Sequence, residues 1–159
     1  MMNGEAEAVA VLLGLGKKYG FWDASETLTT NGVHVCRTSS RFCLGVEHGD
    51  YNGTELFGVG TDRFIWMAFK PNTSGRIRLV SHNFPSEGVV EFAAGSTTEL
   101  MSAEEREASS WKQFPLGVDF VLTKNGFSLA AGFDATIYGN IPGEWTDTTK
   151  LCFAYRCIV

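Results

Sequence analysis

Between positions 38 and 53 the sequence reads Thr38-Ser39-Ser40-Arg41-Phe42-Cys43-Leu44-Gly45-Val46-Glu47-His48-Gly49-Asp50-Tyr51-Asn52-Gly53. This stretch brings an arginine, two carboxylates and an imidazole into one passage from a predicted strand into a turn. Glu47 and Asp50 can accept hydrogen bonds from hydroxyl groups, His48 can donate or accept, and Arg41 adds a permanent positive charge. Its three glycines permit an irregular turn that a ligand can approach closely. The pattern favours a site for a polyol next to a phosphate.

Three other interpretations of these residues stay open. Carboxylates and an imidazole also bind divalent cations, although Glu47, His48 and Asp50 lack the helical i, i+4 pairing of known zinc motifs. Ordinary turn chemistry, in which Asp50 and Asn52 bond to the backbone, is a second alternative. Arg41 by itself could equally be a surface arginine in an ion pair. We expect a sugar site and no metal.

Composition and charge limit the class of protein. The chain has 159 residues, of which 44% are hydrophobic and 19% charged, so it is long and apolar enough for one domain with a real core. Its formal net charge is −5, and it has no dense basic cluster. This argues against nucleic acid and anionic membranes as main partners and fits a small neutral sugar.

The cysteines and the N-terminus indicate a cytoplasmic protein. The cysteines form no C-x-x-C pair and are too sparse for a disulfide-stapled domain: Cys36, Cys43, Cys152 and Cys157. Glu5 and Glu7 precede the first apolar run, so the positive start of a signal peptide is missing. No apolar stretch approaches the ~20 residues that span a bilayer.

Hydrophobic periodicity predicts an α/β (α+β) chain. A helix is expected at about 5–19, strands at 33–36 and from 42 onward, and a hairpin from 61–70 and 76–81 with a third antiparallel strand at 88–92. A capping box at Ser102 opens a helix that continues to Leu122, and Pro115 should kink or divide this helix. Residues 127–138 alternate again as a strand.

Several other side chains are expected to be structural. Arg63, Arg76 and Arg78 could form a phosphate patch, but an exposed hairpin face explains them more simply. His34 and His82 receive no role, and Asp134 lies in no motif. The aromatic residues with strand spacing are expected in the core: Phe64, Trp66, Phe69, Phe127 and Phe133.

The 38–53 stretch closely resembles the signature of the galactokinases, the sugar-kinase branch of the GHMP kinase superfamily, which reads roughly P-G-R-V-N-L-I-G-E-H-T-D-Y-N-G-G. Further segments follow in family-like order, so the resemblance covers roughly Val33 to Pro142. These segments are Asp62-Arg63-Phe64, Gly75 to Ser81, Asn83-Phe84, the helix with Trp111, Gly132-Phe133-Asp134 and Gly139-Asn140-Ile141-Pro142.

The resemblance implies a fold and a reaction. The fold is a mostly antiparallel mixed sheet with covering helices, similar to the GHMP kinase N-terminal domain. The reaction is ATP-dependent phosphorylation of a sugar, galactose by default, at its anomeric hydroxyl, with Mg-ATP as cofactor. In that scheme Glu47, His48 and Asp50 bind the substrate, and Arg41 is catalytic because it supports the developing charge.

The sequence departs from the family pattern in three places. Thr38-Ser39-Ser40 stands where the family has Ala-Pro-Gly, and Val46 replaces the glycine before the glutamate. After Pro142 come Gly143-Glu144-Trp145 instead of the Gly-Leu-Ser-Ser-Ser-Ala loop that holds the ATP phosphates. We therefore expect a sugar-binding domain at 1–142 followed by an atypical tail at 143–159.

The departures also bear on activity. We expect a truncated or frameshifted chain that is inactive alone and binds ATP poorly. The alternative is a non-catalytic galactokinase-like protein that binds or senses a sugar. The oligomeric state stays open.

Overall fold

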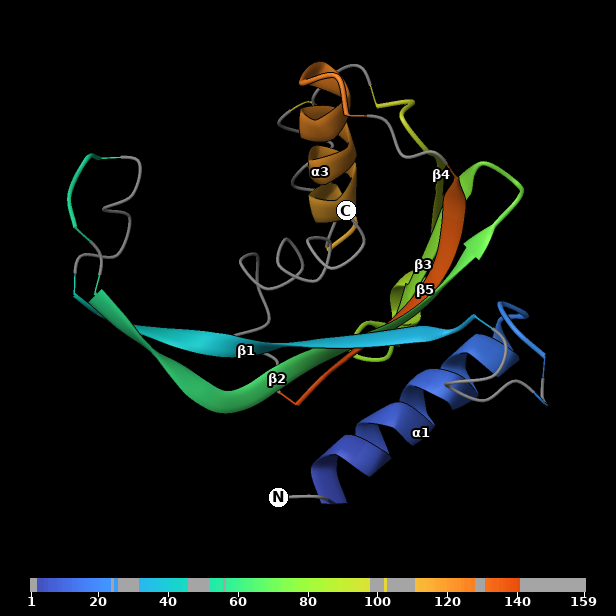
Figure 1. Cartoon of the computed structure of the whole chain (residues 1–159), viewed down its shortest axis with the longest axis horizontal. Coiled ribbons are helices and arrows are strands. Elements are labelled where there is room, and N and C mark those ends of the chain that lie inside the picture. Colours follow the sequence, from blue (N-terminus) through green and yellow to red (C-terminus); the bar gives the residue numbers. More distant parts are fainter. Residues whose placement is uncertain are drawn as a thin grey trace.

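A five-stranded mixed sheet with a helix on each face forms the framework of the chain (Figure 1). The structure is a computed structural model, and it describes residues 3–23, 25, 32–45, 52–55, 57–97, 102, 111–127 and 131–140. The elements are α1 (Asn3–Lys18), β1 (His34–Gly45), β2 (Phe57–Asn72), β3 (Arg76–Ser81), the 3-10 turn η1 (Pro85–Glu87), β4 (Val89–Ala93), α3 (Gln113–Lys124) and β5 (Gly132–Gly139). None of the described helices combines the length and apolar composition needed to cross a bilayer. The predicted α/β class is confirmed.

The strand order is β1-β2-β5-β3-β4, so β5, the last strand among the described residues, lies in the centre of the sheet. β5 is antiparallel to β2 and parallel to β3, while β1 pairs with β2 and β4 with β3 in antiparallel fashion. The predicted hairpin of β2 with β3 is wrong, because β5 separates these two strands. The third antiparallel strand is confirmed as β4.

A glycine explains how β5 can enter between strands that are joined by a short turn. The Asn72 side chain accepts hydrogen bonds from Ser74 and holds the turn, and Gly75 takes a positive φ of 68°. Gly132, where β5 begins, pairs with Asn72. A Cβ on Gly132 would lie 2.3 Å from the carbonyl oxygen of Arg76, so only glycine fits here.

The strands β1 and β2 extend beyond the rest of the sheet as a two-stranded ribbon. β5 pairs with β2 from Ile65 to Asn72. Among the described strands, the first half of β2 therefore pairs with β1 alone. We call the ribbon formed by residues 39–45 and 57–64 the arm; in Figure 1 it curves away from the other strands. The two short strands predicted at 33–36 and from 42 are one strand, β1.

Helix α1 packs on one face of the sheet. Ala8 and Leu12 are fully buried one helical turn apart, and they pack against the β2 side chains Trp66 and Ala68. The helix ends at Lys18, and Gly20 follows with a φ of +67°. The chain turns here, so that the Trp22 indole donates to the Leu13 carbonyl at 3.1 Å. The predicted opening helix is confirmed.

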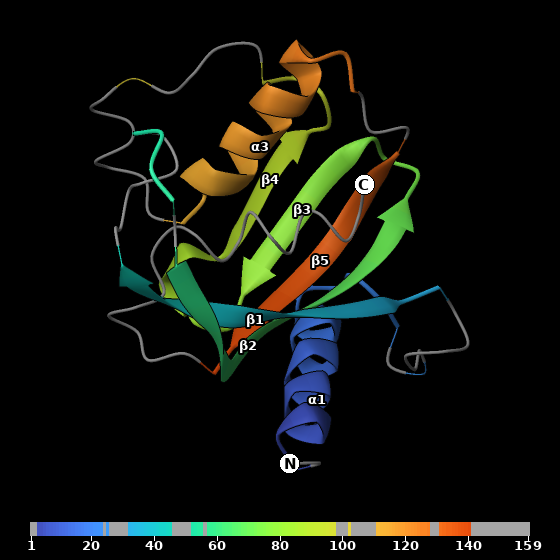
Figure 2. The same ribbon diagram turned by 60° about the vertical axis from the view of Figure 1, so that its left-hand side comes forward.

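Helix α3 belongs to the opposite face, as the turned view in Figure 2 shows. Alternate residues of β2, β3 and β5 form its core with Trp111 and side chains of the helix. The predicted helix from Ser102 to Leu122, which Pro115 should kink or divide, is described from Gln113 onward as α3. Pro115 stands in the first turn of α3, where backbone N–H groups have no partner within the helix, and residues 103–110 lie outside the described residues.

Helix α3 is also tied to the chain that follows β4. Asp119 is 2% exposed, and its two carboxylate oxygens accept hydrogen bonds from the amides of Gly95, at 2.8 Å, and Thr97, at 3.1 Å. A carboxylate inside the helix therefore satisfies two loop amides at once.

Four of the five aromatic residues expected in the core pack there: Phe64, Trp66, Phe69 and Phe133. The prediction for Phe127 is wrong. This residue follows the end of α3 and is 61% exposed, because β5 begins only at Gly132.

Candidate functional site

The structure places one of the four candidate site residues on an element. Arg41 lies on β1, with its backbone opposite Gly60 of β2. Glu47, His48 and Asp50 belong to the connection between β1 and β2 and lie outside the described residues, as does the side chain of Arg41. The motif therefore begins on the arm, and its candidate substrate-binding residues lie in the sequence between the two strand ends at Gly45 and Phe57, which pair with each other.

A break in the strand register precedes Arg41. Ser39 pairs with Phe64, but Arg41 pairs with Gly60, so β2 takes four steps where β1 takes two. Thr61 lies inside this bulge, where its hydroxyl donates to the carbonyl of Ser40 at 3.3 Å and accepts from the amide of Arg63 at 3.2 Å. Bulges of this kind bend a ribbon and re-aim its side chains, and here the bend sits directly beside the candidate catalytic residue.

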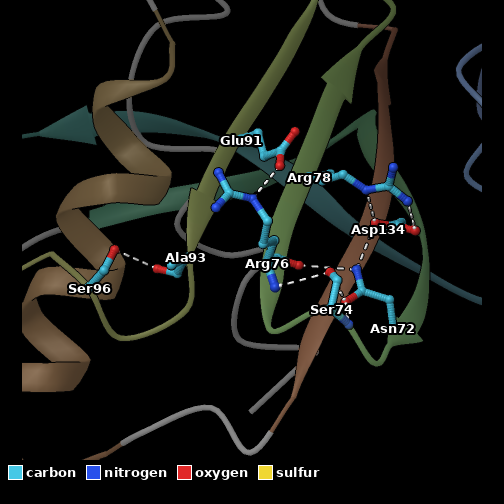
Figure 3. A network of polar contacts seen from close by, with 8 residues as sticks. All are labelled: Asn72, Ser74, Arg76, Arg78, Glu91, Ala93, Ser96 and Asp134. Atoms are coloured by element: carbon cyan, nitrogen blue, oxygen red, sulfur yellow. Dashed lines mark hydrogen bonds and ion pairs between the residues drawn. The ribbon is translucent and has the colours of Figure 1, made fainter.

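A second polar cluster joins side chains of neighbouring strands of the sheet, as Figure 3 shows. Arg78 on β3 donates to both carboxylate oxygens of Asp134 on β5, at 2.7 and 2.6 Å, and Asn72 donates to Asp134 at 2.8 Å. The Asp134 side chain is 5% exposed, and the Arg78 guanidinium also lies over the ring of Phe21, at 5.0 Å. The hydrogen bond and charge of Asp134 raise the pKa of Arg78 above its ordinary value against the opposing effect of burial.

This cluster is an anchor rather than a reactive site, because both oxygens of Asp134 are engaged by Arg78 and Asn72. The expectation of an exposed hairpin face is therefore wrong for Arg78, which links β3 to β5 in the sheet. Arg76 pairs with Glu91 on β4, and Arg63 makes an exposed ion pair with Asp62 at 3.8 Å. Each of the three arginines that could have formed a phosphate patch has a carboxylate partner.

The two described histidines pack against aromatic rings. His34 stacks on Phe69 with ring centroids 5.3 Å apart, and His82 meets Tyr138 edge-on at 5.4 Å. Within the described part of the chain, no group of three or more His, Cys, Asp or Glu side chains could hold a metal. The metal alternative for Glu47, His48 and Asp50 concerns residues outside that part.

Sequence reasoning gave no role to three polar residues near the arm, namely Thr61, Asn83 and Asn140. Asn83 and Asn140 both follow predicted strands, where asparagine is ordinary in turns. From the sequence, Asn83 and Asn140 could be predicted to lie in turns. Their hydrogen bonds could not be predicted, because they are made to strands distant in the sequence.

Comparison with known sequences gives a consistent set of relatives, although no family model matches the chain. The chain is 28% identical over 118 residues to the galactokinase of Lactiplantibacillus plantarum, covering 74% of this chain and 29% of that protein. It is 29% identical over 111 residues to the galactokinase of Bacillus subtilis, covering 70% and 27%. It is 31% identical over 96 residues to that of Staphylococcus carnosus, covering 60% and 23%.

Comparison with solved structures shows the same fold. The crystal structure of Lactococcus lactis galactokinase complexed with galactose superposes with a TM-score of 0.69 at 24% identity, covering 91% of this chain and 34% of that one. The chain thus spans about a quarter to a third of the length of the proteins it matches.

Proposed function

We propose that the chain is a galactokinase-like protein of the GHMP kinase superfamily, similar to the N-terminal part of these enzymes, and that it binds a hexose through the arm. Galactose is the first candidate, since the similar L. lactis galactokinase was solved in complex with it. The observation that carries the proposal is the motif from Arg41 to Gly53, which begins on β1 and continues into the connection between the paired strands β1 and β2.

In this proposal the residues of the motif have separate tasks. Glu47, His48 and Asp50 orient the ring hydroxyls of the sugar, because carboxylates and an imidazole together offer acceptors and a donor. Arg41 supports the charge that develops on the transferred phosphoryl group when the anomeric hydroxyl is phosphorylated. The complete reaction of a galactokinase-like phosphotransferase also needs a site for the nucleotide.

The residues that follow Pro142 do not fit the phosphates of Mg-ATP. Glu144 adds a negative charge, and the indole of Trp145 is bulky where a phosphate loop needs small residues and open backbone amides. The proposal therefore includes no nucleotide site within residues 1–159. This same feature favours the second candidate function, a protein that binds or senses the sugar without phosphorylating it.

Sugar binding is tested by calorimetric titration of the 159-residue chain with several hexoses. A lost charged hydrogen bond costs about 1.5–3 kcal/mol, so we expect Asp50→Ala to weaken galactose binding by roughly one to two orders of magnitude. Asp62→Ala is the matched control, because Asp62 is an exposed carboxylate on β2 that pairs with Arg63. The proposal is wrong if the chain binds no hexose at millimolar concentration, or if both variants bind as the wild type does.

A coupled assay for sugar-dependent ADP release separates the two functions. We expect no release from residues 1–159 with galactose and Mg-ATP. Release that Arg41→Ala abolishes would show instead that the chain contains a phosphate site of its own.

A further inference from the structure

The side chain of Asn140 completes the ladder between β5 and β2. The register that pairs Ile65 with Gly139 brings Phe64 opposite Asn140, and the amide of Asn140 donates to the Phe64 carbonyl at 3.2 Å. In an ordinary antiparallel pair the Phe64 amide would donate to the main-chain carbonyl of Asn140. Here it donates to the side-chain oxygen Oδ1 of Asn140, at 2.8 Å. The main chain can therefore leave the sheet at this residue while the Phe64 amide keeps an acceptor.

The side chain of Asn83 extends the hydrogen bonding of β5 on its other side, next to β3. The parallel ladder of β3 and β5 continues to Ser81, and the amide of His82 still donates to the carbonyl of Ile137 at 2.8 Å. Beyond this point the side-chain amide of Asn83 donates to the Gly139 carbonyl, at 2.9 Å, and accepts from the Gly139 amide, at 2.8 Å. One side chain thus replaces a peptide group of the strand.

These two amides meet at the root of the arm. Asn83, which follows β3, bonds to the backbone of Gly139. The next residue, Asn140, bonds to the backbone of Phe64 on β2. Phe64 is also the residue after which the β1–β2 register breaks on the way to Arg41. Between Phe64 and Phe57 the described strands pair β2 with β1 alone, and the side chains of Phe57 and Val59 are exposed. Within the described part of the chain, the bonds to Phe64 are therefore the last ones between the arm and β5.

We propose that Asn83 and Asn140 are positioning residues that fix the arm, and with it Arg41, relative to the end of β5. They act through the backbone of β5 and β2 and need touch neither sugar nor phosphate. The effect on sugar binding rests on the proposed function of the arm, whereas the effect on the mobility of the arm does not.

The chemistry of the two amides gives a test with a built-in rescue. Asn140→Ala removes the acceptor for the Phe64 amide, whereas Asn140→Asp keeps an oxygen in that place. Asn83 both donates and accepts, so Asn83→Asp should fail as Asn83→Ala does, because a carboxylate has no donor for the Gly139 carbonyl. Asn125→Ala is the control, since Asn125 is an exposed asparagine that bonds only locally, to the Val121 carbonyl at the end of α3.

Two measurements are made on the full chain of each variant, namely amide hydrogen exchange by NMR and galactose affinity by calorimetry. For Asn140→Ala we expect exchange of the amides at 57–64 to rise, and galactose affinity to fall, by about tenfold, the effect of one lost hydrogen bond. Asn140→Asp and Asn125→Ala should behave as wild type in both measurements. Both Asn83 variants should speed exchange at Gly139 and in the arm.

Each outcome decides the proposal. Unchanged exchange in the arm of Asn140→Ala overturns it, and so does failure of Asn140→Asp to restore wild-type exchange. An equal effect of Asn125→Ala would show general loosening instead of positioning. If the wild type binds no galactose, the proposed function fails while the exchange data still decide whether the two asparagines hold the arm.

Discussion

Loss of Arg78 should be costly, because its partner Asp134 is almost fully buried. Arg78→Met leaves the carboxylate with Asn72 as its remaining partner, and breaking a buried pair in this way costs about 3–5 kcal/mol. Arg37→Met is the control, because Arg37 pairs with Glu5 at 3.4 Å on the surface, where such pairs contribute about 0–1 kcal/mol. Urea unfolding gives both free energies. Equal losses in the two variants would show that the Arg78 pair contributes no more than a surface pair.

The raised pKa of Arg78 predicts how this effect depends on pH. A basic group whose pKa is higher in the folded state contributes stability that is present below its ordinary pKa and is lost only as the pH rises above it. The ordinary pKa of arginine is already far above neutrality, so we expect the cost of Arg78→Met to be the same at pH 6 and pH 9. A cost that disappears between these values in urea unfolding would contradict the ion pair.

At the residue scale, the sequence identified the motif but not the anchors. Arg41, Glu47, His48 and Asp50 could be selected because they stand together in the chain. Arg78 and Asp134 are 56 residues apart, and only the parallel register of β3 with β5 brings them opposite each other. No local pattern reports a register of that kind.

Two glycines of α1 should respond in opposite ways to alanine. A Cβ on Gly16 would lie 2.0 Å from the Trp22 indole, whereas a Cβ on Gly14 meets nothing within 4 Å. Gly16→Ala should therefore destabilise the chain by about 1–3 kcal/mol through overpacking. Gly14→Ala should stabilise it by about 0.5–1 kcal/mol, because alanine favours a helix. Urea unfolding of the two variants is the measurement, and a gain of stability in both would show that α1 does not depend on the fit of Trp22.

The link from α3 to the loop after β4 can be tested at Asp119. Asparagine has one acceptor oxygen where aspartate has two, so Asp119→Asn leaves the amide of Gly95 or Thr97 without its partner. The expected cost is about 1–3 kcal/mol, with faster hydrogen exchange at the affected amide. Unchanged exchange at both amides would show that the carboxylate does not hold this loop.

Among the elements, those with a local signal were predicted and those set by distant partners were not. The helix α1 shows its buried face at helical spacing, and β4 follows β3 closely enough to pair with it. The hairpin of β2 and β3 was wrong although its turn was recognised, because Gly132 allows another strand to enter there. The turn residues therefore predict where the chain reverses direction, but they do not predict which strands pair with each other.

At the scale of the whole molecule, a bound sugar should stabilise the native fold. A ligand that binds only the folded state adds about 1.4 kcal/mol when its concentration is ten times Kd. We expect galactose to raise the free energy of unfolding by this amount, and Asp50→Ala to need a higher concentration for the same gain. Urea unfolding with and without galactose checks this. An equal gain with a sugar that does not bind in calorimetry would indicate a solvent effect instead.

The overall fold class followed from composition, periodicity and resemblance together, and the α/β sheet is as expected. The path of the strands through the sheet did not follow, because strand order depends on pairings between residues distant in the sequence. For the candidate site, the candidate residues could be selected from the sequence. The bulge at Thr61 and the hydrogen bonds of Asn83 and Asn140 are seen only in the structure.

The central place of β5 has a consequence for the newly synthesised protein. Before Gly132 to Gly139 have been synthesised, β2 and β3 lack the strand that lies between them in the sheet, so an edge of each is unpaired. Such edges bind other strands readily, so we expect the emerging chain to be prone to aggregation until β5 is present. A chaperone that recognises extended, apolar segments would find its target in this interval, and the arrival of eight residues would remove it.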